Sequence, residues 1–297
     1  MEFAILGPFK VVHNGMQLNL GGHKQRALLA VLACNANQVL SVDRLVEELW
    51  NGRSPRTAVQ NLRVYVYQLR RILGSGKRII WRPPGYALII DTGELDIETF
   101  ADLAAQGERA LSADSADQAA EYLRAALGVW RGPALADLRR VESLHLKAIW
   151  LEERRLAVIE SRTAAELMLG LYASVADELL SLVAEYPLRE NIRAQLMLAL
   201  YRLGRRAEAL AAYREGRTVL VEELGVEPGL RLQRLHKAIL SDDEFPAGTV
   251  PPAVSPDVPE AHVHGPAVGE FRQIRTMLMQ ISRRLDRLEA SMGRDQQ

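Results

Sequence analysis

The clearest periodic pattern of apolar and polar positions lies in residues 55–73, PRTAVQNLRVYVYQLRRIL. Its apolar residues recur every three or four positions, as on the buried face of an α-helix. Ser54 and Pro55 suit the N-cap and first turn of a helix, and Gly74 suits its C-terminal end. The pattern predicts an amphipathic helix over residues 55–73. Its predicted inward residues are Val59, Leu62, Val66, Leu69 and Leu73.

The face opposite this apolar stripe is basic and rich in amides. The stretch contains no Asp or Glu, whereas an ordinary exposed helix mixes charges of both signs. Arg, Gln and Val are side chains that contact guanine, adenine and the thymine methyl group in the major groove of DNA. A solvated basic face, and burial of Tyr67 against a sheet, are the alternative interpretations. The candidate major-groove residues are Thr57, Gln60, Arg63, Val64, Tyr67, Gln68 and Arg71.

The residues around this helix predict a small sheet, two further helices and a hairpin. Short β-rich runs, separated by Gly7-Pro8 and Asn14-Gly15, predict N-terminal strands. Two helical patterns follow, the second with Ser41 as its cap and Trp50 buried. Two strand-like runs then flank the stiff, basic turn at residues 82–85. The predicted strands are 2–6, 10–12, 16–20, 78–81 and 86–90, and the predicted helices are 23–33 and 41–50.

This order of elements is that of a winged helix, whose third helix enters the major groove and whose hairpin reaches the backbone or minor groove. LRRI at 69–72 and PGY at 84–86 resemble the OmpR-type winged helix of response regulators. In more detail, residues 3–240 resemble the Streptomyces antibiotic regulatory proteins. The motifs that carry the second resemblance are ILGP at 5–8, KQRALL at 24–29, VDRL at 42–45, LW at 49–50 and YVYQLRR at 65–71.

The charge distribution agrees with a basic module that meets a polyanion. Residues 1–90 contain 12 Lys or Arg against 4 Asp or Glu, while residues 91–297 contain 25 against 33, so the net charge is zero. The residues predicted to contact DNA, either at phosphates or from the wing, are Lys24, Arg44, Arg56, Arg70, Lys77, Arg78 and Arg82. The resemblance further implies that the turn between the second and third helices contacts RNA polymerase, through Trp50, Asn51, Gly52, Arg53 and Ser54.

Residues 96–240 have helical patterns throughout. Leu169-Gly170 and Leu203-Gly204 lie 34 residues apart, and a 34-residue period is typical of tetratricopeptide (TPR) repeats. A generic helical bundle is the alternative. The resemblance implies a bacterial transcriptional activation domain here, closing with LGVEPG at 224–229 and LQRLH at 232–236.

The end of the chain has its own pattern. Residues 241–268 are rich in proline and predict an extended linker. Residues 269–293 carry an apolar seam spaced by three and four residues, which predicts a coiled-coil helix for oligomerisation; packing of this helix on its own chain is the alternative. The seam consists of Phe271, Ile274, Leu278, Ile281, Leu285, Leu288 and Met292.

Motifs for enzymatic or metal chemistry are weak. GSGK at 74–77 lacks the preceding Gly and following Ser or Thr of a phosphate-binding loop, and His262 and His264 lack further metal ligands. The single cysteine, Cys34, is predicted to be a small core residue. No signal peptide or membrane-spanning run is evident, so we expect a cytoplasmic, nucleoid-associated protein that is not an enzyme and needs no cofactor or metal.

The sequence therefore predicts an α+β winged helix-turn-helix domain (1–91), an all-α TPR-like activation domain (96–240), a linker (241–268) and a coiled-coil helix (269–293). The expected function is sequence-specific activation of transcription. The resemblance implies promoters of an antibiotic biosynthesis cluster, direct-repeat operators bound by at least two protomers, and recruitment of RNA polymerase. The alternative is a TPR-type scaffold or ligand sensor whose DNA binding is weak or conditional.

Overall fold

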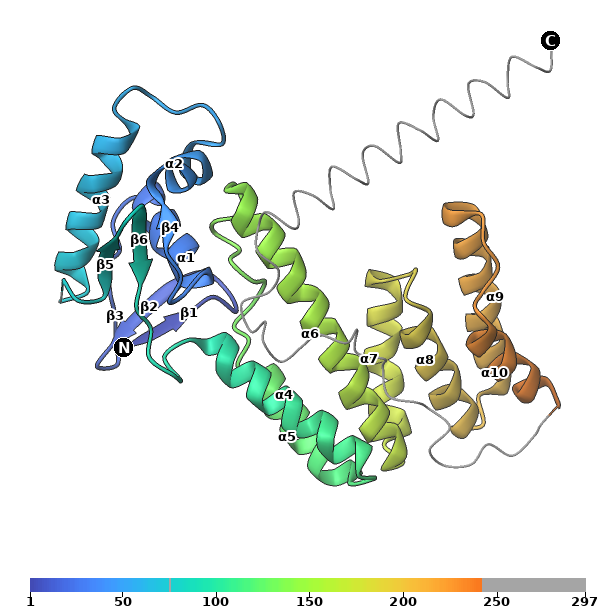
Figure 1. Cartoon of the computed structure of the whole chain (residues 1–297). Helices are drawn as coiled ribbons and strands as arrows, with labels where there is room; N and C mark the ends of the chain where they lie inside the picture. Colours follow the sequence, from blue (N-terminus) through green and yellow to red (C-terminus); the bar gives the residue numbers. More distant parts are fainter. Residues whose placement is uncertain (75, 242–297) are drawn as a thin grey trace, which may run out of the picture. The chain divides into compact units, whose positions relative to one another are not determined.

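The computed structural model describes residues 1–74 and 76–241 (Figure 1). Within this part, the chain forms two compact units. The first combines residues 1–98 with residues 130–152, and the second combines residues 99–129 with residues 153–241. The predicted linker and coiled coil, including the seam from Phe271 to Met292 and the His262/His264 pair, lie outside the described residues. The predicted boundary at residue 91 remains a proposal about which segment folds independently.

The first unit contains two small antiparallel sheets. The N-terminal sheet has the order β1-β2-β3 and turns between β2 and β3 at Asn14 and Gly15, which have φ angles of 49° and 76°. Positive φ at both positions is the conformation that an Asn-Gly hairpin supplies. The second sheet has the order β4-β6-β5, and its two-residue strand β4 was not predicted. The strands are β1 (Glu2–Ala4), β2 (Lys10–His13), β3 (Met16–Gln17), β4 (Leu40–Ser41), β5 (Ile79–Arg82) and β6 (Gly85–Leu88).

Three helices complete the winged helix: α1 (His23–Cys34), α2 (Val42–Trp50) and α3 (Ala58–Ile72). Helix α1 is buried on nearly all sides from Ala27 to Cys34. Ser41 caps α2 as predicted, because its hydroxyl accepts a hydrogen bond from the Arg44 amide at 3.2 Å. Trp50, which the sequence placed in the core, is only half-buried.

Helix α3 starts later than the sequence pattern predicted. Residues 55–57 form a turn, Thr57 occupies the N-cap position, and Ser54 makes no cap. The buried stripe then begins at Ala58, which turns Val59 outward with 39% of its surface exposed. The other predicted inward residues, Leu62, Val66, Leu69 and Leu73, are buried. Gly74 follows with φ 69°, as expected for a residue that ends a helix.

The wing is held close to β4 by a glycine. A Cβ atom added to Gly85 would lie 1.7 Å from the Leu40 carbonyl oxygen, so no larger residue fits there without separating the strands. Across the hairpin, Trp81 is the register partner of Tyr86, and Arg82 is the partner of Gly85.

Residues 130–141 belong to the first unit and bond to the start of the chain. The Arg131 amide donates to the Leu6 carbonyl at 2.9 Å, and the Leu135 amide donates to the Gly7 carbonyl at 2.8 Å. Asp137 accepts a hydrogen bond from the Phe9 amide at 2.8 Å and forms an ion pair with Arg26. These contacts attach a segment distant in sequence to the edge of the winged helix.

The second unit is helical. Its helices α7, α8, α9 and α10 pack around one apolar core that includes Leu179, Ile192, Met197, Leu200 and Ile239. Helices α4 and α6 each contribute residues to both units. The helices are α4 (Asp96–Ser112), α5 (Ala116–Gly128), α6 (Glu142–Met168), α7 (Tyr172–Glu185), α8 (Glu190–Arg202), α9 (Arg206–Leu224) and α10 (Leu230–Ser241).

The 34-residue spacing appears in the helical unit as a repeated turn. Gly170 lies between α6 and α7, Gly204 lies between α8 and α9, and both have φ 76°. Helix α8 packs against both α7 and α9. Assignment of this arrangement to the TPR class remains a proposal.

Candidate nucleic-acid interface

The outward face of α3 presents the side chains that the sequence selected. Tyr67 and Val64 are 61% and 45% exposed, so burial of Tyr67 against a sheet does not occur. Val59, which the sequence placed in the core, joins this face at its N-terminal end. We call the following exposed set the α3 face: Thr57, Val59, Gln60, Arg63, Val64, Tyr67, Gln68 and Arg71.

The inward side of α3 fixes the orientation of that face. Ala58, Leu62, Val66 and Leu69 are at most 3% exposed, and α3 packs against both α1 and α2. Burying several aliphatic side chains on one helix stripe contributes about 1.5–3 kcal/mol for each large residue. The α3 face is therefore held by a packed scaffold, as an interface that reads shape and base edges requires.

Two of the predicted phosphate contacts on α1 and α2 also have partners within the chain. The Lys24 ammonium donates to the Leu49 carbonyl at 2.8 Å and lies 4.6 Å from the centre of the Trp50 ring. Arg44 approaches Glu48 at 3.7 Å and is half-buried. The third, Arg56, is exposed in the turn that precedes α3.

The basic residues near the wing divide into two groups. Lys77 and Arg82 are exposed. Arg78 instead forms a two-point ion pair with Glu94, with nitrogen–oxygen distances of 2.6 and 2.7 Å. Arg70 donates from Nε to the Ile79 carbonyl at 2.8 Å and lies over the Tyr86 ring. Arg78 and Arg70 thus connect parts of the unit, and the predicted contacts of both residues to DNA stay predictions.

The turn from Trp50 to Ser54 has a defined conformation and an exposed surface. Asn51 closes α2 with φ 49°, Gly52 follows with φ 76°, and residues 51–54 are exposed. The Asn51 side-chain amide donates to the Arg140 carbonyl at 3.3 Å, and the Trp50 ring stacks on Tyr65 with centroids 6.5 Å apart. The turn is therefore held at Trp50 and Asn51 by these contacts, and its later residues are exposed to solvent.

Sequence reasoning missed one exposed aromatic residue. Trp81 lies in β5 and is 51% exposed. Its position beside Arg82 was visible in the sequence, but the strand pattern alone did not show which face it occupies. The cross-strand partner, Tyr86, is buried, so the two rings differ sharply in exposure.

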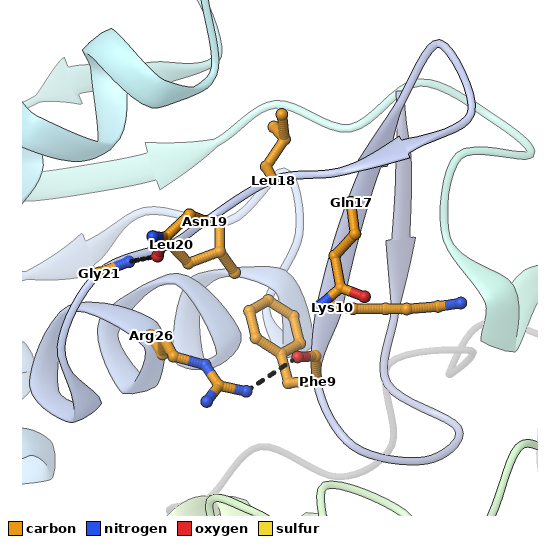
Figure 2. A pocket seen from close by; sticks show the side chains of 8 residues that line it. All are labelled: Phe9, Lys10, Gln17, Leu18, Asn19, Leu20, Gly21 and Arg26. Carbon is orange, nitrogen blue, oxygen red and sulfur yellow. Dashed lines mark hydrogen bonds between the residues drawn. The ribbon is translucent and has the colours of Figure 1, made fainter.

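The structure also contains a shallow pocket beside the N-terminal sheet (Figure 2). Arg26 donates to the Phe9 carbonyl at 3.2 Å in its wall, and the Gly21 amide donates to the Asn19 side chain at 3.1 Å. The lining residues include no Ser, Thr, Cys, His, Asp or Glu, so they do not form a nucleophile–base pair. The lining residues are Phe9, Lys10, Gln17, Leu18, Asn19, Leu20, Gly21 and Arg26.

Within residues 1–74 and 76–241, no group of three or more His, Cys, Asp or Glu side chains has the arrangement of a metal site. Cys34 is buried, and burial raises its pKa from 9.0 to about 11. Across the same residues, every helix is too short or too polar to cross a bilayer.

Two family models match the chain. Residues 17–88 match the C-terminal domain of transcriptional regulatory proteins, and residues 95–240 match the bacterial transcriptional activator domain. The chain is 38% identical to regulatory protein DnrI of Streptomyces peucetius, over 82% of this chain and 93% of DnrI.

Other relatives are longer than the matched region. Regulatory protein AfsR of Streptomyces coelicolor is 38% identical over 82% of this chain, which spans only 24% of AfsR. A solved structure, Mycobacterium tuberculosis EmbR in complex with a low-affinity phosphopeptide, aligns with a TM-score of 0.80 and 35% identity. That alignment covers 84% of this chain and 67% of EmbR. With its exposed basic helix, its two domain matches and its similarity to DnrI, the chain belongs to the Streptomyces antibiotic regulatory protein family of transcriptional activators.

Proposed function

We propose that the protein activates transcription by inserting α3 into the major groove of promoter DNA. The observation that carries this proposal is the α3 face, which is exposed, contains Arg, Gln and Tyr side chains, and has no carboxylate. Arg63 and Arg71 are the strongest candidates for guanine recognition, because a guanidinium forms two parallel hydrogen bonds to the O6 and N7 atoms of guanine.

The remaining basic residues of the first unit would orient the protein on DNA. Arg56, Lys77 and Arg82 are exposed and suit contacts to phosphates, which fix register without reading sequence. Lys24 and Arg44 are half-buried near helix N-termini, where their charge adds to the field that attracts an anion.

Activation requires a contact to RNA polymerase holoenzyme, and the exposed turn at residues 51–54 is our proposal for it. It lies between α2 and α3, outside the α3 face, and its cation is Arg53. The family suggests direct-repeat operators in an antibiotic biosynthesis gene cluster, bound by at least two protomers in the cytoplasmic nucleoid. We further propose that residues 269–293 strengthen this assembly by raising the effective concentration of a second protomer.

Binding to the intergenic regions beside the coding sequence tests the proposal. Full-length protein is titrated against each fluorescent duplex and a shuffled duplex of the same composition. We expect Arg63→Ala and Arg71→Ala each to weaken specific binding by about 1–3 kcal/mol and to relax sequence preference. Arg109→Ala, at an exposed position in α4, is the matched control and should bind as the native chain does.

The salt dependence separates this function from a scaffold or ligand sensor. Phosphate contacts make log K fall steeply with log salt, by roughly 0.9 for each contact. Steep dependence with protection of direct repeats in a footprint supports the activator. Native affinity in both Arg63→Ala and Arg71→Ala would refute the assigned face. Absence of specific binding by the native chain would favour the sensor.

The polymerase contact is tested by run-off transcription with purified holoenzyme. Arg53→Ala is expected to bind the promoter with native affinity and to lose most of the activation. Unchanged activation by this variant would remove the turn from the proposal, while lost DNA binding would assign Arg53 to the DNA interface.

A further inference from the structure

The wing carries an exposed aromatic side chain that the proposed function leaves unexplained. Trp81 is 51% exposed to solvent. Among the large apolar residues exposed in the winged helix, Met16 lies on the N-terminal sheet, Val39 precedes β4, and Val59, Val64 and Tyr67 lie on α3. Trp81 lies on the hairpin. Large rings with one polar group are common at interfaces, because they combine apolar area with a directed hydrogen bond.

The Trp81 ring is held in place. It packs edge-on against the Tyr86 ring, with centroids 5.0 Å apart and an interplanar angle of 70°. Trp81 and Tyr86 are opposite residues of the β5–β6 pair, so their side chains share one face of the sheet. The arrangement resembles a cross-strand aromatic pair with one buried and one exposed member.

That face of the sheet is the one turned toward α3. The Arg70 guanidinium of α3 lies 5.9 Å from the centre of the Tyr86 ring, and its Nε donates to the Ile79 carbonyl of β5. Arg70, Tyr86 and Trp81 therefore form a continuous connection from the third helix to the wing. Trp81 lies at its outer end, next to the exposed Arg82.

We propose that Trp81 is a DNA-backbone contact: its ring packs on a deoxyribose and its Nε1–H donates to a phosphate oxygen. The inference rests on the proposed function, because it requires α3 in the major groove. An indole has one donor and no acceptor, and a phosphate oxygen has only lone pairs. A contact to sugar and phosphate positions the wing and reads no sequence.

This assignment gives Trp81 a signature that differs from that of the neighbouring cation. A neutral donor displaces no condensed counterion, so Trp81→Ala should leave the slope of log K against log salt unchanged. Arg82→Ala should reduce that slope by about one. The Trp81→Ala variant should bind specific and shuffled duplexes about tenfold more weakly, by the same factor for both.

Trp81→Phe separates the ring from the hydrogen bond. It preserves an aromatic partner for Tyr86 and removes the donor, so we expect a loss smaller than that of Trp81→Ala. Tyr122→Ala removes a similarly exposed ring from α5 and is the control that should bind normally. Thermal unfolding of each variant verifies that the wing remains folded.

Acrylamide quenching of the intact protein provides a readout that needs no substitution. Trp130 is 8% exposed and Trp50 and Trp150 are half-buried, so Trp81 should contribute much of the accessible emission. Specific DNA should protect that emission in the native chain and not in Trp81→Phe.

The inference would be overturned if Trp81→Ala bound DNA with native affinity. It would also be overturned if DNA protected the emission of Trp81→Phe from acrylamide as strongly as that of the native chain. Either result would leave the proposed function intact. A change in the ratio of specific to shuffled binding would overturn the assignment to the backbone. A native chain that binds no duplex would instead refute the proposed function.

Discussion

Arginines of the first unit differ in what their guanidinium groups contact. Arg63 and Arg71 project from the α3 face, while Arg78 pairs with Glu94 and Arg70 reaches the Ile79 carbonyl. The charge is the same in all four, but desolvation and pairing give Arg70 and Arg78 structural roles. A substitution at Arg78 should therefore act first on folding, whereas one at Arg63 should act on DNA binding.

We expect the protein to lose stability in acid, because the Glu94 carboxylate becomes protonated there. Burial opposes its ionisation, but hydrogen bonds from the Asp91 amide, Arg78 and the N-terminal amine outweigh this and hold its pKa below 4.5. A depressed folded pKa adds stability above the unfolded pKa, and this is lost as pH falls below about 4.5. Glu94→Gln should lower the free energy of unfolding at pH 7 by about 1–3 kcal/mol and flatten the acid dependence.

Tryptophan fluorescence during urea denaturation measures this effect in the relevant unit. All four tryptophans, at positions 50, 81, 130 and 150, belong to the first unit. Glu2→Gln alters an exposed carboxylate on β1 and should leave the curve unchanged. Equal acid dependence in native protein and Glu94→Gln would contradict the assignment.

Cys34 should be inert in the folded protein. Its pKa of about 11 keeps the thiol protonated at pH 8, and burial blocks access to it. A disulfide reagent such as DTNB should release one equivalent of thiolate only on unfolding. Because the folded state retains the proton longer, stability should decline as pH rises past 9.0. Rapid labelling of the native chain would show that the unit opens locally.

At the scale of elements, periodicity predicted most of the winged helix. It gave α1, α2, the exposed face of α3 and both strands of the wing, because each has a strong local signal. It misplaced the start of α3, since Ser54-Pro55 is a common N-terminal signature that the chain uses as a turn instead. It missed β4, because two residues that pair with a strand 45 positions away have no local pattern.

The wing contains one position, Gly85, where an added methyl group does not fit. Gly85→Ala places Cβ against the Leu40 carbonyl oxygen, so β4 and β6 must separate. We expect a loss of about 1–3 kcal/mol in unfolding free energy, seen by tryptophan fluorescence, together with weaker DNA binding. Gly93→Ala is a control for lost glycine at an uncrowded position, although its φ of 82° adds strain of its own. If Gly85→Ala had the stability of the native protein, β4 would be able to move away from β6 at little cost in free energy.

At the scale of the whole chain, the first unit depends on a segment that the activator-domain match includes. Asp137 lies within residues 95–240, which match the activator-domain family. It nevertheless accepts a hydrogen bond from the Phe9 amide and forms an ion pair with Arg26. Sequence periodicity could not reveal this, because residues 130–141 contain no regular element and the partners of Asp137, Phe9 and Arg26, lie more than 100 positions away from it. The prediction of separate consecutive modules came from local pattern alone.

Asp137→Ala should therefore destabilise the DNA-binding unit. The Phe9 amide and the Arg26 guanidinium both lose an acceptor, which costs about 1–3 kcal/mol for each group that stays unsatisfied. Hydrogen exchange should show faster exchange at residues 5–11. Asp102→Ala, an exposed site in α4, should leave that region protected. Unchanged exchange in Asp137→Ala would mean that water replaces the carboxylate without loss.

The return of residues 130–152 to the start of the chain limits how such regulators can be recombined. A chimera that joins residues 1–91 to a foreign activation module would discard Asp96, Arg131 and Asp137, so the Ile5, Leu6 and Phe9 amides would lose their acceptor carboxylates. Engineered regulators with a new DNA specificity are therefore better sought by grafting the proposed DNA-reading α3 face alone into an intact chain. Only the helix surface is then exchanged between regulators, and both domains are kept in one chain.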